Sequence, residues 1–67
     1  MSPTHREFEV LLARCQAGSR NGAAALLGIQ TKTVHWHLAR LFERCGCVDE
    51  AMAAFTHRDE LERMRAA

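Results

Sequence analysis

Two closely spaced pairs of residues in this chain could bind a metal or do thiol chemistry, His35-x-His37 and Cys45-x-Cys47. Zinc ligands that share one helix face come three or four residues apart. In a helix, His35 and His37 are turned about 200° from each other, so we expect no metal site there. Buried free cysteine packs as a small apolar residue, and this is the role expected for Cys45 and Cys47. A redox or metal sensor built on these two thiols is the alternative.

Acid–base groups are present at His5, Glu7, Glu9 and His57. No nucleophile stands beside a base, and the chain has neither a phosphate-binding loop nor a catalytic pair of carboxylates. The sequence therefore predicts no enzyme, no catalytic residue and no cofactor. With 67 residues the chain is one small domain, residues 1–67. A binding or regulatory module is the expected class.

Charge and composition narrow that class. The apolar share of 48% and the charged share of 25% are typical of a globular chain. No apolar run could span a bilayer, and the N-terminus lacks the apolar stretch of a secretory signal. With an odd number of cysteines, three, we expect a reducing, cytoplasmic setting. Residues 1–47 carry six Lys/Arg against three acids, whereas residues 48–67 carry three against five. Any surface that binds nucleic acid is therefore expected within residues 1–47, the first two-thirds of the chain.

Capping signals and apolar periodicity predict an all-α fold. Four helices are expected, at residues 5–16, 20–27, 31–45 and 49–64, the last with a possible break near residue 56. Thr4-x-x-Glu7 is a capping box, Ser19 and Asp49 are further caps, and Gly18, Gly28 and Gly46 are stop signals. Gly22 inside the second helix costs about 1 kcal/mol relative to alanine.

The apolar residues of two predicted helices form stripes. The first helix has Phe8, Leu11, Leu12 and Cys15; the third has Val34, Leu38, Leu41, Phe42 and Cys45. Trp36 lies almost opposite the second stripe. It is either covered by a neighbouring segment or part of a contact surface, and we favour contact. A short helix, a glycine turn and a longer helix with a polar outer face form a helix-turn-helix pattern.

Four stretches resemble the LuxR/GerE-type helix-turn-helix domain: T-H-R-E-F-E-V-L (4–11), A-G-S-R-N-G-A-A-A-L-L-G-I (17–29), K-T-V-H-W-H-L-A-R-L-F-E-R-C-G (32–46) and V-D-E-A-M-A-A-F (48–55). The likeness runs without gaps from Thr4 to about Phe55. Its most specific part is L-G-I-x-x-K-T-V-x-x-H-L-x-x-L-F-x-x-x-G. The resemblance implies a bacterial transcription factor with a tetrahelical fold. It also implies that the third helix reads DNA and the fourth dimerises.

The resemblance also implies roles for single residues. Base contacts fall on His35, Trp36 and Ala39; phosphate contacts fall on Arg20, Asn21, Lys32, Thr33 and Arg40; and the dimer interface falls on Val48, Met52 and Phe55. The family often has Lys or Arg at the base-reading positions. In this chain His35 could donate to a guanine acceptor, and Trp36 could cover a thymine methyl. Gln30 stands where a Ser or Thr usually caps the third helix and is a poorer cap.

The expected function is a cytoplasmic, sequence-specific DNA-binding regulator that acts on double-stranded DNA as a homodimer, without a membrane partner. The alternative is a protein-interaction adaptor on the same fold, with Trp36 in a protein interface. Such an adaptor could bind another transcription regulator or RNA polymerase. The near-neutral net charge of +1 favours the adaptor, while the helix-turn-helix pattern favours the regulator.

Overall fold

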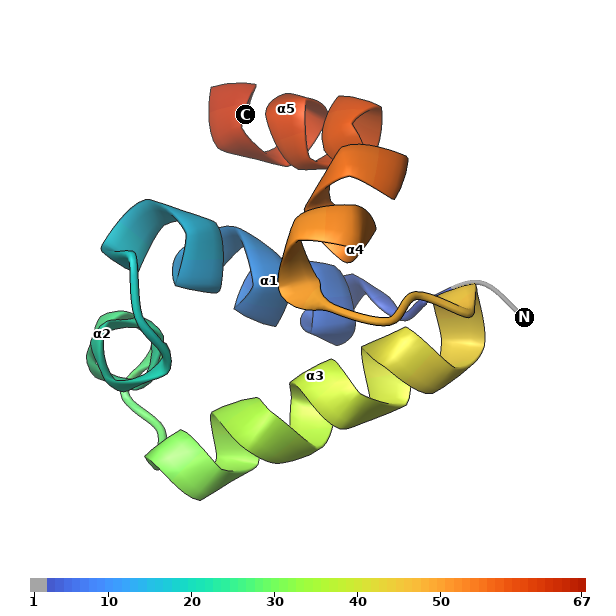
Figure 1. The fold of residues 1–67 in the computed structure, drawn as a ribbon. Helices are drawn as coiled ribbons and strands as arrows, with labels where there is room; N and C mark the ends of the chain where they lie inside the picture. Colours follow the sequence, from blue (N-terminus) through green and yellow to red (C-terminus); the bar gives the residue numbers. More distant parts are fainter. Residues whose placement is uncertain (1–2) are drawn as a thin grey trace.

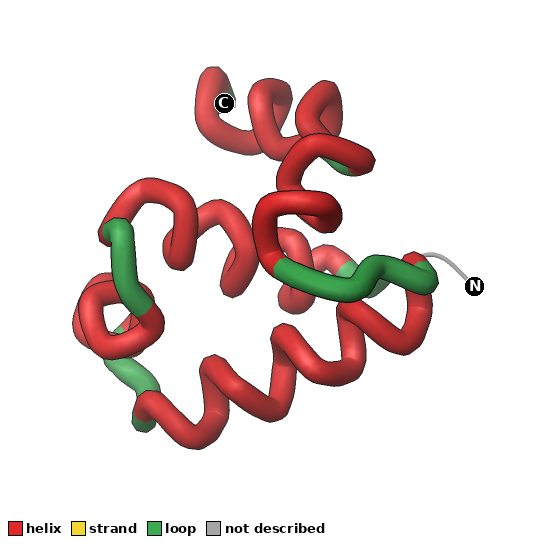
Figure 2. Tube along the Cα trace, in the orientation of Figure 1, coloured by secondary structure: helices red, strands yellow, loops and turns green. Residues whose placement is uncertain are grey.

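The computed structural model describes residues 3–67, which fold into helices joined by short turns and contain no strand (Figures 1 and 2). The helices are α1 (His5–Ala17), α2 (Arg20–Leu27), α3 (Thr31–Cys45), α4 (Glu50–Thr56) and α5 (Arg58–Ala66). This part of the chain is all-α, as predicted. Residues 1 and 2 of the predicted domain lie outside the described residues.

The helix boundaries follow the capping signals of the sequence. The Thr4 hydroxyl accepts from the Glu7 amide at 3.2 Å, and the Glu7 carboxylate accepts from the Thr4 amide at 3.0 Å. The side chains of Ser19 and Asp49 cap α2 and α4 in the same way. The Gln30 side chain makes no capping hydrogen bond at the start of α3, in line with the prediction that Gln30 is a poor cap. Local polar contacts therefore define where α1, α2 and α4 begin.

The last predicted helix is two helices. α4 ends and α5 begins at His57, whose backbone leaves the helical region at φ −109° and ψ 23°. The His57 ring lies edge-on to the Phe8 ring, with 5.1 Å between the centroids. Figure 1 shows α5 on the far side of α1 and α4 from α3, and α5 contacts only those two helices. The break near residue 56 therefore directs the C-terminal helix back over α1.

The core forms where α1, α2 and α3 pack together. Its buried apolar residues are Val10, Leu11, Ala13, Ala23, Ala24, Val34, Leu38, Leu41, Cys47, Ala53 and Leu61. The α3 stripe is confirmed. Of the predicted α1 stripe, Leu11 is buried and Phe8 and Leu12 pack in part against the core, but the buried face of α1 is rotated toward Val10 and Ala13. Cys15, the last residue of the predicted stripe, is exposed, whereas Val10 is fully buried. The rotation lets Glu7 and Arg14, on the same side of α1, reach charged partners on α3 and α4.

Glycine at position 22 is required by the packing of α2 on α1. A Cβ at Gly22 would lie 2.8 Å from the Cβ of Ala17, closer than two carbon atoms can approach. Glycine therefore lowers the helix propensity of α2, but it allows α2 to pack close to the end of α1.

The turn after α3 joins two of the cysteines. Gly46 adopts the left-handed conformation at φ 70° and brings the Cα atoms of Cys45 and Cys47 to 5.4 Å, within the range of a disulfide. The structure pairs the two as a disulfide. The expectation that both remain free thiols is therefore wrong in this structure, although Cys47 does pack into the core as expected.

A buried carboxylate ties α1 to α3. Glu7 is only 3% exposed. One of its oxygens caps Thr4, and the other accepts from the Arg44 guanidinium at 3.0 Å. The start of α1 is therefore fixed against the end of α3.

No helix within residues 3–67 has both the length and the apolar character needed to cross a membrane.

Candidate nucleic-acid interface

The outer face of α3 carries the three residues predicted to contact bases. His35, Trp36 and Ala39 are all exposed. The buried face of the same helix consists of Val34, Leu38 and Leu41. Trp36 is 55% exposed, which confirms that it lies opposite the core stripe and not under a neighbouring segment. This face of α3 therefore contributes nothing to the core and is open to a partner.

Trp36 is surrounded by cationic and polar groups. The Arg40 guanidinium lies over the indole, 5.2 Å from the ring centroid, where the ring quadrupole attracts a cation. The His37 ring meets the indole edge-on, with 5.0 Å between centroids. On the other side, Lys32, Thr33 and Trp36 line a shallow hollow of about 420 Å³. The α3 face thus combines a flat apolar ring with two cations.

The first turns of α2 and α3 are tied together by a side-chain hydrogen bond. The Thr31 hydroxyl donates to the Asn21 side-chain oxygen at 2.9 Å. Because Asn21 lies in the first turn of α2 and Thr31 begins α3, this bond fixes the relative placement of the two helix N-termini. Asn21, predicted to touch phosphate, is therefore exposed on the same side as the start of α3.

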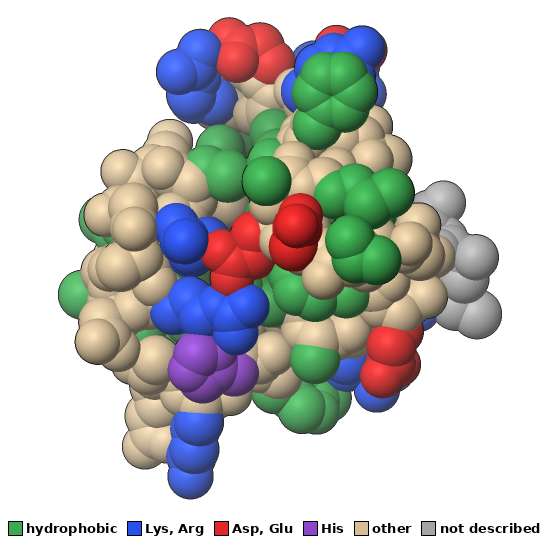
Figure 3. Space-filling model, in the orientation of Figure 1, with side chains coloured by type: hydrophobic (Ala, Val, Ile, Leu, Met, Phe, Trp, Pro, Cys, Tyr) green, Lys and Arg blue, Asp and Glu red, His purple; other side chains and the backbone are tan. Residues whose placement is uncertain are grey.

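Arg20 belongs to a charged cluster that we call the Glu50 cluster: Arg14, Arg20, His35 and Glu50. Arg20 reaches one Glu50 oxygen through Nε and through Nη2, each at 2.5 Å. Its Nη1 lies 2.5 Å from Nδ1 of His35. Arg14 approaches the second Glu50 oxygen at 2.7 Å. Figure 3 shows basic, acidic and histidine side chains side by side on this face of the molecule.

The Glu50 cluster brings together residues from four helices. Glu50 sits in the first turn of α4, where the positive end of the helix dipole favours a carboxylate. Its side chain is only 21% exposed, so its ion pairs are less screened than those on the surface. Arg20 was predicted to touch phosphate, but part of its charge is already offset by Glu50. Lys32 and Arg40, by contrast, make no ion pair with a carboxylate of residues 3–67.

The residues predicted to form a dimer interface lie apart from the α3 face. Val48 is 82% exposed, Met52 47% and Phe55 68%; we call these three residues the α4 surface. The Arg58 guanidinium lies 4.4 Å from the centroid of the Phe55 ring and donates to the Phe55 carbonyl at 2.9 Å. The α4 surface is therefore apolar, unburied and bordered by a cation.

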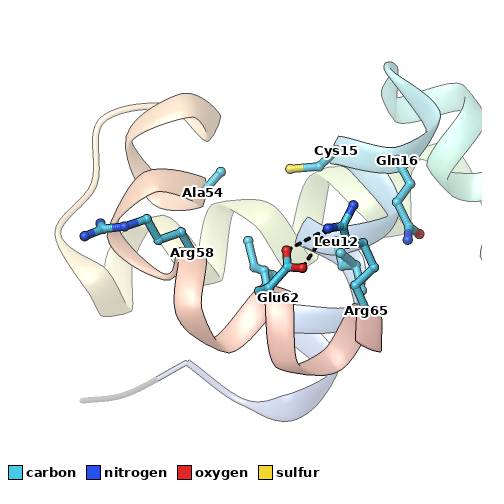
Figure 4. Close-up of a pocket in the computed structure, with 8 residues that line it drawn as sticks. Leu12, Cys15, Gln16, Ala54, Arg58, Glu62 and Arg65 are labelled. Carbon is cyan, nitrogen blue, oxygen red and sulfur yellow. Dashed lines mark hydrogen bonds and ion pairs between the residues drawn. The ribbon is translucent and has the colours of Figure 1, made fainter. Parts of the chain in front are cut away.

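A groove of about 320 Å³ lies between α1 and α5. Figure 4 shows Cys15 and Gln16 of α1 on one side of it and Glu62 and Arg65 of α5 on the other. Partial burial raises the pKa of the Cys15 thiol, and the neighbouring Arg14 charge opposes this rise. The thiol is therefore held in its neutral, less nucleophilic form. We assign no function to this groove.

The histidine and cysteine pairs are not arranged as metal ligands. His35 faces Arg20, whereas the His37 ring contacts Trp36. Within residues 3–67, no three residues of the types His, Cys, Asp and Glu are grouped so that they could hold a metal ion.

Sequence reasoning missed Glu50 as the centre of a cluster and Arg14 as its partner. The sequence predicted no role of its own for Arg14. One signal was available, because Glu50 follows a capping Asp49 and falls in the first turn of a predicted helix. Its partners on α1 and α2 are distant in sequence, however, and no local pattern identifies them.

Comparison with known proteins gives no match, since no family model, no curated protein and no solved structure matches the chain. The likeness to the LuxR/GerE-type domain therefore rests on the residues quoted above, and so do the roles taken from it. The structure contributes the positions of those residues: the predicted base contacts are exposed on α3, and the predicted dimer contacts are exposed on α4 and the turn before it.

Proposed function

We propose that this chain is a sequence-specific DNA-binding regulator of transcription, in which α1 to α4 form the tetrahelical helix-turn-helix fold of LuxR/GerE-type domains and α5 follows it. In this proposal α2 and α3, joined by the turn at residues 28–30, are the helix-turn-helix pair. α3 enters the major groove. The observation that carries the proposal is the open outer face of α3, where Trp36 is 55% exposed beside Lys32 and Arg40, which pair with no carboxylate of residues 3–67.

Each residue of that face suits a task in DNA recognition. Lys32 and Arg40 carry charges for phosphates, and the Thr33 hydroxyl and the Asn21 amide can also donate to them. His35 and Trp36 carry N–H donors for base edges, and Trp36 and Ala39 offer apolar area for a thymine methyl. The α3 face therefore contains groups for both affinity and sequence preference.

The α4 surface supports a homodimer. A domain of this size gains little net stability from one core, and Val48 and Phe55 leave large apolar areas in water. Pairing the α4 surfaces of two copies would bury these side chains and present two α3 helices to two half-sites. A dimer also doubles the number of phosphate contacts. We propose that the regulator acts in a bacterial cytoplasm.

Fluorescence of Trp36, the sole tryptophan, tests DNA binding directly. Duplex DNA is titrated into the protein at several salt concentrations, and the oligomeric state is followed by sedimentation. If Lys32 and Arg40 of two protomers each neutralise one phosphate, the slope of log K against log [salt] is about −4, at roughly −0.9 per contact. Arg40→Ala should bring this slope nearer to zero by about 2 units for the dimer. Arg63→Ala, which removes an arginine from α5, is the matched control and should leave it unchanged.

A second function is favoured by the same tryptophan. With a net charge of +1 and an exposed apolar ring, α3 could dock on another transcription regulator or on RNA polymerase. Binding through an apolar, Trp36-centred interface would respond little to salt. Trp36 emission that ignores duplex DNA but shifts to the blue as protein concentration rises would favour this adaptor over the DNA-binding regulator.

A further inference from the structure

The contact between Arg20 and His35 determines which ring nitrogen of His35 carries hydrogen. Arg20 Nη1 lies 2.5 Å from Nδ1 of His35. A guanidinium nitrogen can only donate hydrogen bonds, so Nδ1 must accept. A neutral imidazole that accepts at Nδ1 carries its hydrogen on Nε2. His35 is exposed on the outer face of α3, and its remaining nitrogen is therefore a donor.

Arg20 is itself held in place by Glu50. Two nitrogens of its guanidinium, Nε and Nη2, contact one Glu50 oxygen, and Nη1 is left for His35. The second Glu50 oxygen is occupied by Arg14 at 2.7 Å. Because Glu50 is anchored at the start of α4 and its side chain is only 21% exposed, the Arg20 fork has little freedom to turn away. The order of contacts runs from Arg14 through Glu50 and Arg20 to His35.

We infer that His35 is a specificity-determining residue that reads guanine through its Nε2–H, and that Arg20, held by Glu50, is the residue that positions it. This inference rests on the proposed DNA-binding function. In the major groove, guanine offers two adjacent acceptors, N7 and O6. Adenine places an N6 amino donor beside its N7, cytosine offers a donor, and thymine offers a single acceptor, O4, beside its methyl group. A ring that can only donate at its outward nitrogen is therefore best matched by guanine.

The tautomer is measured in the free protein, without DNA. Long-range ¹H–¹⁵N correlations of the labelled full chain at neutral pH should show His35 with its hydrogen on Nε2. Arg20→Ala should move the Nδ1 resonance downfield, because that nitrogen loses its donor. Arg6→Ala, which removes an exposed arginine from α1, is the matched control and should leave His35 unchanged. A hydrogen on Nδ1 in the wild type, or no response to Arg20→Ala, would overturn the inference.

The base preference is measured with chemically altered DNA. A duplex is selected by the wild-type protein from a randomised pool, and each guanine in turn is replaced by 7-deazaguanine, which lacks the N7 acceptor. At one guanine per half-site, the replacement should weaken wild-type binding about fivefold or more. It should have no further effect on His35→Ala. In Arg20→Ala, the preference for guanine at that position should fall by a larger factor than the overall affinity for DNA. If Arg20 only stabilised the fold, both would fall together.

The possible outcomes distinguish a failure of guanine recognition by His35 from a failure of DNA binding itself. Saturable, salt-sensitive binding without any guanine whose N7 matters to His35 would overturn the inference and leave DNA binding standing. Failure to bind any duplex of the pool would overturn both. Loss of the same guanine preference in Arg6→Ala would also count against the inference, because Arg6 does not contact His35.

Discussion

Glu7 is the one charged side chain among residues 3–67 that is buried, at 3% exposure. We predict that Glu7→Gln destabilises the fold strongly. A glutamine at this position of a capping box still offers an oxygen to the Thr4 amide. The substitution therefore leaves the helix cap in place and removes mainly the negative charge opposite Arg44, whose Nε lies 3.0 Å from the carboxylate.

The magnitude follows from the burial of the pair. Removing one partner of a buried ion pair costs about 3–5 kcal/mol, because the remaining charge loses that attraction where water cannot fully replace it. The Arg44 side chain is 20% exposed and keeps some contact with water, so we expect a loss of about 2–3 kcal/mol, at or just below the lower end of that range. For a domain of this size each 1 kcal/mol lowers Tm by roughly 4–8 °C. The expected decrease in Tm is therefore about 10–20 °C.

Urea unfolding followed by circular dichroism measures the change, and Glu62→Gln provides a matched control. Glu62 also pairs with an arginine, Arg65, at 2.7 Å, but its side chain is 65% exposed. An exposed pair contributes at most about 1 kcal/mol, so Glu62→Gln should have a small effect. If the two substitutions cost the same, within about 0.5 kcal/mol, the reasoning from burial is wrong. A double-mutant cycle with Arg44→Gln assigns the difference to this pair.

Three further predictions follow from single contacts. By helix propensity alone, Gly22→Ala would stabilise the fold by about 1 kcal/mol. We expect it instead to lower the free energy of unfolding by about 1–2 kcal/mol in urea titrations, because the new Cβ would meet Ala17. A rise in the free energy of unfolding would contradict the observed packing. Cys15 should react with iodoacetamide at pH 7 more slowly than a free cysteine peptide, because its pKa is raised by burial, and a faster reaction would contradict this. Phe55→Asp should weaken dimerisation about a hundredfold in sedimentation experiments, since two phenylalanines lose roughly 3 kcal/mol of burial between them. Leu26→Asp, an exposed leucine on α2, should leave the dimer intact, and equal effects would argue against the α4 surface.

Helix boundaries were predictable because they are set by contacts within one turn. The capping hydrogen bonds of Thr4, Ser19 and Asp49 each join residues three apart in sequence. A sequence pattern at that spacing contains the whole contact. The same holds for the α3 stripe, whose periodicity is unambiguous once Trp36 is placed opposite it. Local chemistry therefore sufficed for the starts of α1, α2 and α4 and for the exposed face of α3.

The face of α1 and the Glu50 cluster were not predictable by such means. Apolar residues occur on more than one side of α1, so periodicity alone left its rotation open. The rotation is decided by partners far along the chain: Arg44 is 37 residues from Glu7, and Glu50 is 30 residues from Arg20. The Cys45–Cys47 pairing was missed for another reason. The left-handed turn at Gly46 was predicted, but the spacing Cys-x-Cys does not by itself show that this turn brings the two sulfur atoms together.

The distribution of ion pairs explains how a chain with a net charge of +1 could still present a basic surface. Six of its nine Lys/Arg residues pair with carboxylates of the described residues: Arg6, Arg14, Arg20, Arg44, Arg63 and Arg65. Of the other three, Arg58 lies against Phe55, and Lys32 and Arg40 flank Trp36.

The cations that are left for an external anion on the α3 face are thus few and lie next to its exposed ring. With so few phosphate contacts, non-specific attraction to DNA is weak. Most of the affinity of the proposed regulator must then come from the Trp36 ring, the His35 donor and the pairing of two copies. Such a protein would depend more on the correct base sequence than a strongly basic domain does, which makes the positioning of His35 by Arg20 the contact on which its specificity most depends.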